Sequence, residues 1–227
     1  MRNLLDLFQI LDIEVHNTDL YELALTHPSC NSDQNTKHQD YERLEFVGDS
    51  VIGFVSADLI YKSHSEMDQG LMSKLRSHLV CSKSLANYSR KIKLYEFIHI
   101  GHSITAEQLK NSDKILEDVF EALMGAIYLE QDIGIAYRII ESFIKEDIQN
   151  INIDDLVDPK TRLQEEIQAE YREAVKYVII DEYGPAHDKT FEVEVLFNGL
   201  ILGCGKGKSK KAAEEAAAKD ALRKRSV

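Results

Sequence analysis

The chain has 227 residues, of which 44% are hydrophobic and 29% charged, enough for one large domain or two modest ones. The best candidate for a membrane span, residues 51–61, is short and contains Asp58, and Asp6 and Asp12 interrupt the N-terminal apolar stretch, so we expect neither a span nor a signal peptide. The three cysteines are far apart and odd in number, which predicts neither a disulfide framework nor a zinc site and favours a reducing, cytoplasmic setting.

The net charge of −12 is distributed unevenly along the chain. Residues 159–227 carry 13 basic and 12 acidic side chains, whereas residues 1–158 carry 14 basic and 27 acidic ones. The last 22 residues alone hold 8 basic against 3 acidic side chains. A basic cluster of this kind is typical of phosphate binding, although a solubilising tail explains a lone Lys/Arg run equally well.

Residues 1–148 are predicted to form an all-helical domain. Apolar residues recur there at three- and four-residue spacings, whereas the alternation expected of strands is weak. Within this domain, the segment YERLEFVGDS at residues 41–50 places three acids on one helical face, because Glu42, Glu45 and Asp49 fall within an arc of roughly 60°. The opposite side is aliphatic, with Leu44, Val47, Val51 and Val55. Taken alone, this segment leaves a functional site and an ordinary solvated face equally open, and the spacing does not explain Asp58, which falls among the aliphatics.

A second acidic pair, Asp118 and Glu121, lies three residues apart and shares a helical face. Its neighbours Val119, Leu123 and Ile127 are apolar, so this helix is expected to be buried. Carboxylates beside a core are costly unless something neutralises them. Magnesium is a hard cation that prefers oxygen ligands and keeps several waters, so the pattern favours a magnesium site.

Residues 149–157 are polar and acidic and are predicted to be a linker, and residues 158–226 are predicted to form a small α+β domain. Asp158 and Pro159 suit the start of a helix, and Asn198-Gly199 is a strong hairpin signal between two alternating segments. The predicted order is α-β-β-β-α, with a helix over 160–171, strands over 175–180, 191–197 and 200–205, and an alanine-rich helix over 209–225.

Several of these segments resemble the ribonuclease III family. ERLEFVGDS at residues 42–50 matches the family signature almost completely, ALTHPS at 24–29 resembles the segment upstream, and KILEDVFEALMG at 114–125 resembles the second acidic helix. The C-terminal part is similar to a double-stranded-RNA-binding domain, on the landmarks KTRLQE at 160–165, GPAH at 184–187 and GKGKSKKAA at 205–213. The resemblance covers nearly the whole chain. It implies an all-α endonuclease domain followed by a small α+β double-stranded-RNA-binding domain.

The resemblance implies an endoribonuclease that hydrolyses double-stranded RNA by a metal-activated water, with Mg²⁺ as cofactor and Mn²⁺ as a substitute. It implies 5′-phosphate and 3′-hydroxyl ends, processing of ribosomal RNA precursors and other structured RNAs, and a homodimer. We expect neither a membrane nor a nucleotide cofactor as a partner. The implied metal ligands are Glu45, Asp49, Asp118 and Glu121.

Roles within this set also follow from the resemblance. Asp49 and Glu121 match the catalytic pair, and Glu42 matches an auxiliary acid near the scissile strand. Phe46 lies near the acidic face of its helix and matches a dimer contact, although a core aromatic is the alternative. Gln69 stands where the family usually has Glu before Gly, so we hypothesise that metal affinity is somewhat weaker or that a second metal is held less well.

Duplex RNA is gripped by such domains across two minor grooves and the phosphates between them, over about 16 base pairs. The first helix of the small domain carries four polar side chains on one face, suited to 2′-hydroxyls and base edges: Thr161, Gln164, Glu165 and Gln168. His187 sits in a turn and would enter the next minor groove. The phosphate contacts expected at the start of the last helix are Lys208, Lys210 and Lys211.

Two rival interpretations remain open. One is a double-stranded-RNA-binding protein without activity, whose nuclease domain is a dimerisation scaffold. The complete set of five acids argues against it, because a lost activity would show a broken set. The other is a metal-dependent hydrolase of another nucleotide substrate, whose small domain recruits a protein. His187 and the lysines at 208–211 argue against that interpretation.

Overall fold

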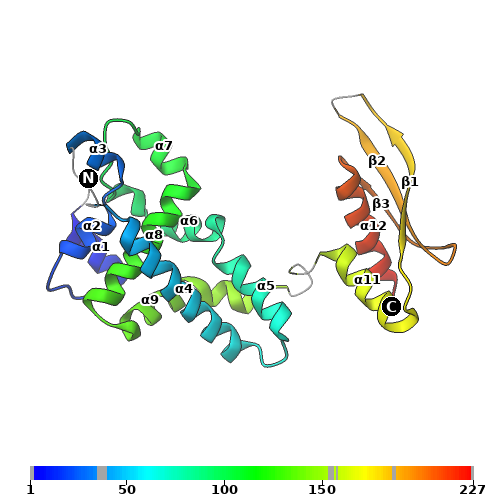
Figure 1. Ribbon diagram of the computed structural model, residues 1–227, viewed down its shortest axis with the longest axis horizontal. Coiled ribbons are helices and arrows are strands. Elements are labelled where there is room, and N and C mark those ends of the chain that lie inside the picture. The colour runs from blue at the N-terminus through cyan, green and yellow to red at the C-terminus, as the bar shows by residue number, and fades with distance from the viewer. Residues whose placement is uncertain (1–2, 35–39, 153–155, 157, 186–187, 226–227) are drawn as a thin grey trace. The chain divides into compact units, whose positions relative to one another are not determined.

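The computed structural model describes residues 3–34, 40–152, 156, 158–185 and 188–225. The chain divides into two compact units, residues 1–151 and 152–227, which we describe separately. The first is helical and the second contains the sheet (Figure 1). This architecture confirms the predicted fold class, an all-α domain followed by an α-β-β-β-α domain. Among the described residues, every helix is too short or too polar to span a lipid bilayer.

The first unit is built around two long helices that lie against each other, α4 and α8 (Figure 1). The remaining helices surround this pair. In chain order the unit contains α1 (Leu4–Leu11), α2 (Asp19–Ala24), α3 (Ser29–Gln34), α4 (Glu42–Ser63), α5 (Gln69–Leu79), α6 (Ser82–Lys91), the short 3-10 helix η1 (Leu94–Glu96), α7 (Ala106–Asn111), α8 (Asp113–Glu130) and α9 (Ile133–Asn150).

The crossing of α4 and α8 is unusually close because glycines lie at it. A Cβ atom on Gly48 would meet the backbone oxygen of Glu121 at 1.7 Å, and one on Gly125 would meet the backbone oxygen of Leu44 at 2.4 Å. Neither position has room for a side chain, so the two helices touch backbone to backbone. The crossing therefore fixes Glu121 beside the first half of α4.

The predicted faces of α4 agree with its burial. Leu44, Val51 and Val55 are buried and Val47 is partly buried, as the spacing predicts. Asp58, which the spacing left unexplained, accepts a hydrogen bond from the hydroxyl of Tyr137 on α9 at 2.8 Å and pairs with Lys62 at 2.7 Å. Tyr137, from a distant part of the chain, thus satisfies the hydrogen-bonding capacity of a carboxylate that lies among aliphatic residues.

The second unit has one three-stranded antiparallel sheet in the order β1-β2-β3. Asn198 and Gly199 join β2 to β3, both with positive φ (49° and 80°), as a two-residue hairpin turn requires. A Cβ on Gly205 would lie 2.1 Å from the backbone nitrogen of Ala217, so the last helix packs directly on the third strand. The elements are α11 (Pro159–Tyr171), β1 (Lys176–Tyr183), β2 (Thr190–Phe197), β3 (Leu200–Gly207) and α12 (Lys210–Arg225).

The segment between the units bears on the predicted linker at 149–157. Helix α9 continues to Asn150, and residues 153–155 and 157 lie outside the described residues. Asp158 caps α11 by accepting a hydrogen bond from the backbone N–H of Thr161 at 3.0 Å, with Pro159 in the first turn. The exact extent of the linker stays a prediction.

Candidate metal centre and nucleic-acid interface

Three carboxylates from α4 and α8 converge in the first unit. One oxygen from each of Glu45, Asp118 and Glu121 lies within 4.8 Å of the others. Asp118 and Glu121 are buried, with 6% and 8% of their surface exposed, and Glu45 is partly buried. We call these three residues the acidic triad. They are three of the four predicted metal ligands.

The neighbourhood of the acidic triad is built by the segment that precedes α4. Asp40 accepts a hydrogen bond from the backbone N–H of Glu42 at 3.1 Å, at the start of the helix. The buried Tyr41 donates its hydroxyl hydrogen to Asp118 Oδ2 at 3.3 Å. Burial and the charge of Asp118 raise the pKa of Tyr41, so it remains a neutral donor.

The charges in this group oppose one another. Burial, with the charges of nearby acids, raises the pKa of Glu121 from its usual 4.5 to about 8, and the nearby acids are Asp49, Glu117, Glu45 and Asp118. Burial and the charge of Asp118 also raise the pKa of Glu45. Carboxyl groups this close together ionise with difficulty, and a nearby cation is needed for all of them to be negatively charged at once.

A divalent metal ion fits these residues. Apart from the ammonium of Lys114 at 2.6 Å, Asp118 Oδ1 is buried without a hydrogen-bond donor among the described residues. Oxygen-only donors of this charge suit hard cations such as Mg²⁺ or Mn²⁺. The acidic triad is therefore a candidate metal centre.

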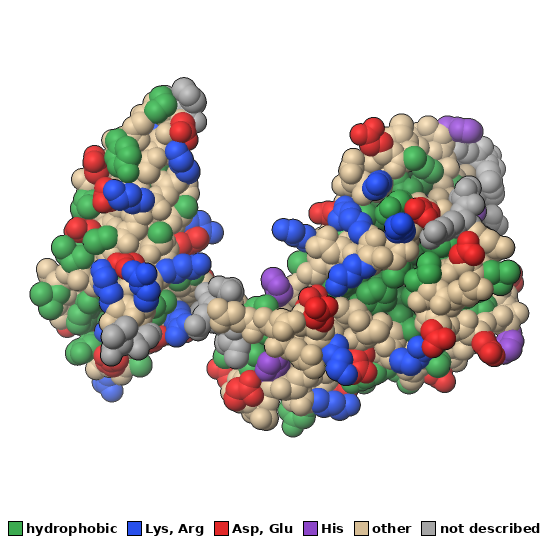
Figure 2. All heavy atoms as spheres, turned by 180° about the vertical axis from the view of Figure 1, so that it is seen from behind, with side chains coloured by type: hydrophobic (Ala, Val, Ile, Leu, Met, Phe, Trp, Pro, Cys, Tyr) green, Lys and Arg blue, Asp and Glu red, His purple; other side chains and the backbone are tan. Residues whose placement is uncertain are grey.

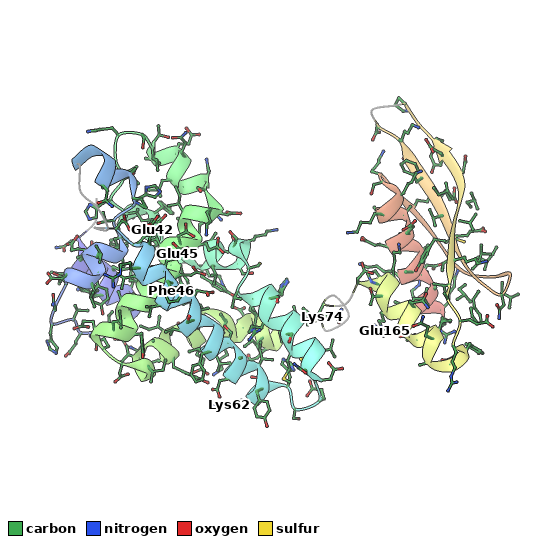
Figure 3. All side chains as sticks on the ribbon, viewed as in Figure 1. Glu42, Glu45, Phe46, Lys62, Lys74 and Glu165 are labelled. Carbon is green, nitrogen blue, oxygen red and sulfur yellow. The ribbon has the colours of Figure 1, made fainter. Side chains whose placement is uncertain are left out.

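Two predicted acids lie outside the acidic triad. Asp49 is exposed on α4, although its charge contributes to the raised pKa of Glu121. Glu42 is exposed at the first residue of α4, near Glu45 and Phe46 in Figure 3. Gln69 is the first residue of α5 and is exposed, and its effect on metal binding stays a hypothesis.

The sequence reasoning missed two residues beside the triad, Lys114 and Glu117. Lys114 pairs with Asp118 and also lies 3.7 Å from Glu45 and 3.8 Å from Glu117. The hydrogen bond to Asp118 is the main cause that raises the pKa of Lys114. Lys114 is visible in the sequence as a charge four positions from a predicted acid, a spacing that is common on ordinary helix surfaces.

The predicted RNA-facing residues of α11 differ in their surroundings. Thr161, Glu165 and Gln168 are exposed, whereas Gln164 holds the following loop by accepting from the backbone N–H of Val175 at 3.2 Å. A shallow hollow of about 370 Å³ borders this helix, lined by Lys160, Thr161, Gln164, Glu165 and Tyr177. The predicted contact His187 lies outside the described residues.

The predicted phosphate-binding lysines are exposed around the start of α12 and have partners within the unit. Lys208 pairs with Asp188 at 2.7 Å, Lys211 lies 3.8 Å from Glu215, and the ammonium of Lys210 lies over the ring of Phe191. Figure 2 shows basic and acidic side chains mixed over this unit. A bound phosphate would therefore have to displace Asp188 from Lys208 or Glu215 from Lys211.

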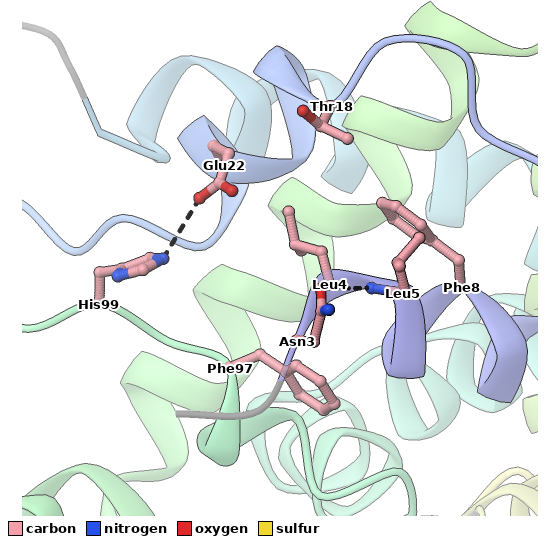
Figure 4. A pocket seen from close by; sticks show the side chains of 8 residues that line it. All are labelled: Asn3, Leu4, Leu5, Phe8, Thr18, Glu22, Phe97 and His99. Atoms are coloured by element: carbon pink, nitrogen blue, oxygen red, sulfur yellow. Dashed lines mark hydrogen bonds and ion pairs between the residues drawn. The ribbon is translucent and has the colours of Figure 1, made fainter.

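A second hollow of about 370 Å³ lies elsewhere in the first unit (Figure 4). On its wall, His99 Nε2 lies 3.3 Å from Glu22 Oε2, and Asn3 caps α1 by accepting a hydrogen bond from the backbone N–H of Leu5. No predicted site residue lines it; the lining is Asn3, Leu4, Leu5, Phe8, Thr18, Glu22, Phe97 and His99. It is separate from the candidate metal centre.

Comparison with known families accounts for both units. Residues 17–148 match the family model described as Ribonuclease-III-like, which is more than half of the chain. The chain belongs to the ribonuclease III family. Residues 159–225 match the double-stranded RNA binding motif. The predicted order, a nuclease domain followed by an RNA-binding domain, is therefore confirmed, whereas the exact domain bounds stay a prediction.

Individual members of the ribonuclease III family agree with this assignment. The chain is 40% identical over 224 residues to Ribonuclease 3 of onion yellows phytoplasma, which covers 99% of this chain and 92% of that protein. The crystal structure of the nuclease domain of ribonuclease III from Campylobacter jejuni is 33% identical, with a TM-score of 0.59, over 67% of this chain and all of that one. A second structure of that domain, described as structurally flexible in the region involved in dimer formation, has a TM-score of 0.57 and 33% identity, over 63% of this chain and 99% of that one.

Proposed function

We propose that this protein is a magnesium-dependent endoribonuclease that cuts double-stranded RNA and leaves 5′-phosphate and 3′-hydroxyl ends. The observation that carries the proposal is the acidic triad, which lies in a chain that matches both a ribonuclease III model and a double-stranded RNA binding motif. Mn²⁺ is expected to substitute for Mg²⁺, because both take carboxylate oxygens. Precursors of ribosomal RNA and other structured RNAs are the proposed substrates, as is typical of the family.

The proposed roles follow the charges of the site. Glu45, Asp118 and Glu121 would hold the metal, and Asp49 would complete the ligand set from the exposed side of α4. When bound, the ion supplies an activated water and offsets the negative charge that develops on the scissile phosphate. Glu42, at the exposed start of α4, would lie nearer to the RNA.

Glu121→Gln tests this proposal. The variant keeps the side chain's size and removes its negative charge, so we expect cleavage of a long labelled RNA duplex to fall by roughly 100-fold or more, since a ligand to the ion is lost. Duplex binding, measured by gel shift, should stay within about twofold of wild type, because the second unit is untouched. Glu141→Gln on α9, which removes a carboxylate paired with Lys145, is the control and should cleave normally.

Two results would count against the enzyme. One is undiminished cleavage in EDTA, and the other is undiminished cleavage by Glu121→Gln. Duplex binding without any cleavage by the wild-type protein would instead support the rival function, a scaffold that binds double-stranded RNA.

We also infer that the protein is a homodimer and works in the cytoplasm. Three exposed aromatic side chains follow one side of α4, with Phe46, Phe54 and Tyr61 exposed at 78%, 60% and 72%. Large apolar side chains in such a row typically mark an interface. Phe46 was the predicted dimer contact, and one Campylobacter jejuni nuclease domain of similar structure is described as having a region involved in dimer formation. None of the three cysteines, all of which lie in the described part of the chain, forms a disulfide, which supports a reducing compartment.

A further inference from the structure

Lys114 places a positive charge inside the candidate metal centre. Its ammonium lies 2.6 Å from Asp118 Oδ1 and 3.7 Å from Glu45 Oε1, which are both members of the acidic triad. The side chain of Lys114 is 69% exposed, whereas that of Asp118 is only 9% exposed. A flexible surface cation thus reaches down to a buried carboxylate.

The ammonium and a divalent ion need the same oxygens. Asp118 Oδ1 has no other donor among the described residues, so in the metal-free protein Lys114 is what compensates its charge. A divalent ion bound at Asp118 Oδ1 would lie within a few ångströms of the Lys114 ammonium, and like charges at that separation repel one another. Since Lys114 is exposed, it can leave the oxygen without disturbing the core.

Glu117 gives the displaced ammonium a second partner. Its Oε2 lies 3.8 Å from Lys114 Nζ, and its side chain is 16% exposed. Glu117 is not a member of the acidic triad. An ion that takes Asp118 and Glu45 therefore leaves Glu117 available to Lys114.

We propose that Lys114 is a displaceable counter-ion of the metal centre: it neutralises Asp118 and Glu45 in the metal-free protein, lowers the affinity for the divalent cation, and transfers to Glu117 when that cation binds. This inference rests on the proposed function, because it assumes that the acidic triad binds the metal. Lys114 acts through the carboxylates and is a positioning residue.

Calorimetric titration of Mg²⁺ alone into the metal-free, full-length protein tests the proposal without any measurement of cleavage. Lys114→Met keeps the length of the side chain and removes its charge, so its Kd for Mg²⁺ should be roughly three- to tenfold lower than that of wild type. Lys114→Arg keeps the charge and should stay within about twofold. Lys62→Met removes a lysine that also pairs with an aspartate four residues away, but at the far end of α4 (Figure 3), and should also stay within about twofold.

The outcomes separate this inference from the function on which it rests. An unchanged or higher Kd for Lys114→Met, with normal binding by wild type, overturns the counter-ion role alone. If wild type does not bind Mg²⁺, or if Asp118→Asn binds Mg²⁺ as well as wild type does, the metal centre itself is overturned, and the inference with it.

A double-mutant cycle tests the transfer to Glu117. In the wild-type background, Glu117→Gln should weaken Mg²⁺ binding for two reasons: a negative charge near the ion is lost, and so is the second partner of Lys114. In the Lys114→Met background only the loss of the negative charge matters, so the fold-change in Kd caused by Glu117→Gln should be smaller. Equal fold-changes in the two backgrounds would overturn the transfer.

Discussion

Gly48 and Glu121 meet where α4 crosses α8, and this contact sets the position of one carboxylate of the acidic triad. An added methyl group on Gly48 would lie 1.7 Å from the backbone oxygen of Glu121, a distance that no side-chain adjustment can relieve. Because the obstacle is backbone, the helices themselves would have to move apart. Packing and the geometry of the acidic triad are therefore coupled at a single residue.

Gly48→Ala should destabilise the protein by more than about 3 kcal/mol, because it forces two buried helices apart. Urea unfolding followed by circular dichroism measures this change. Gly53→Ala, on the same helix, is the matched control: a Cβ there would meet no atom within 4 Å, so stability should not fall. Equal stability of the two variants would contradict the close crossing.

His27 is expected to contribute to the pH dependence of stability in the first unit, in the direction opposite to Glu121. Its Nδ1 accepts a hydrogen bond from the backbone N–H of Ser29 at 3.0 Å, and burial lowers its pKa below the usual 6.5, although the charges of Asp118, Asp40 and Glu42 act in the opposite direction. The unfolded chain therefore takes up this proton at a higher pH than the folded protein does. The contribution of His27 to the free energy of unfolding is fully present above pH 6.5 and is lost as the pH falls from 6.5 toward the pKa of the folded protein.

Replacing His27 with Gln should make the change in stability from pH 7.5 to pH 5.5 more favourable than in wild type, because the destabilising contribution of His27 is removed. Glu121, whose raised pKa stabilises the folded protein as the pH falls, is present in both proteins and cancels in this comparison. Urea titrations at a series of pH values give the slope for each protein. His78→Gln, which removes an exposed imidazole, should keep the wild-type slope. A wild-type slope in His27→Gln would show that another group carries the pH dependence.

Some residues of the site could not have been predicted from the sequence. The shared face of Glu42, Glu45 and Asp49 follows from helical spacing, but spacing does not show that Asp49 is exposed while Glu45 meets the second helix. The role of Lys114 depends on the packing of α8 against α4. Without that packing, its spacing to Asp118 is that of an ordinary surface pair.

Helix α4 carries both a member of the acidic triad and a row of exposed aromatic side chains. Glu45 meets α8, and Phe46, Phe54 and Tyr61 are exposed. Helical periodicity predicted that the acids lie opposite the aliphatic residues, because successive residues of an α-helix differ by about 100°, but it did not predict the aromatic row. Strand β1 was harder to predict: only Tyr177 of its residues is even partly buried, so alternation was a weak guide to its end, and the strand continues to Tyr183 rather than ending at residue 180.

Phe54→Glu should convert the proposed dimer to a monomer, because it places a charge in the middle of the aromatic row. We expect the dimer Kd to rise by at least roughly 30-fold, as for the loss of a central interface residue. Sedimentation over a range of protein concentrations measures this. Leu5→Glu, which alters an apolar residue 62% exposed on α1, should leave the dimer intact. A dimer that survives Phe54→Glu would place the interface elsewhere.

At the scale of the whole molecule, acidic and basic character are divided between the two parts of the chain. Residues 1–158 carry 14 basic against 27 acidic side chains, and the last 22 residues carry 8 against 3. A net negative charge attracts cations and repels RNA, so on the proposed function we expect the C-terminal lysines to supply the attraction for RNA. The sequence alone predicted this division, but not that the lysines have partners within their own unit.

Replacing Lys210 and Lys211 together with Ala should weaken binding of duplex RNA regardless of its sequence and reduce the slope of log affinity against log salt by roughly 1 to 2. Fluorescence anisotropy at several salt concentrations gives the slope. Lys219→Ala, an exposed lysine two turns further along α12, is the control and should keep the wild-type slope. An unchanged slope in the double variant would remove these lysines from the phosphate contacts.

The backbone contact between α4 and α8 also bears on how this protein can diverge in evolution. The approach of Glu45 to Glu121 requires two glycines at the crossing, because neither position has room for a side chain. We expect core substitutions that conserve volume to be better tolerated than any substitution of these glycines. Relatives that share only about two-fifths of their residues with this chain can in this way keep the same chemistry, provided that both glycines are retained.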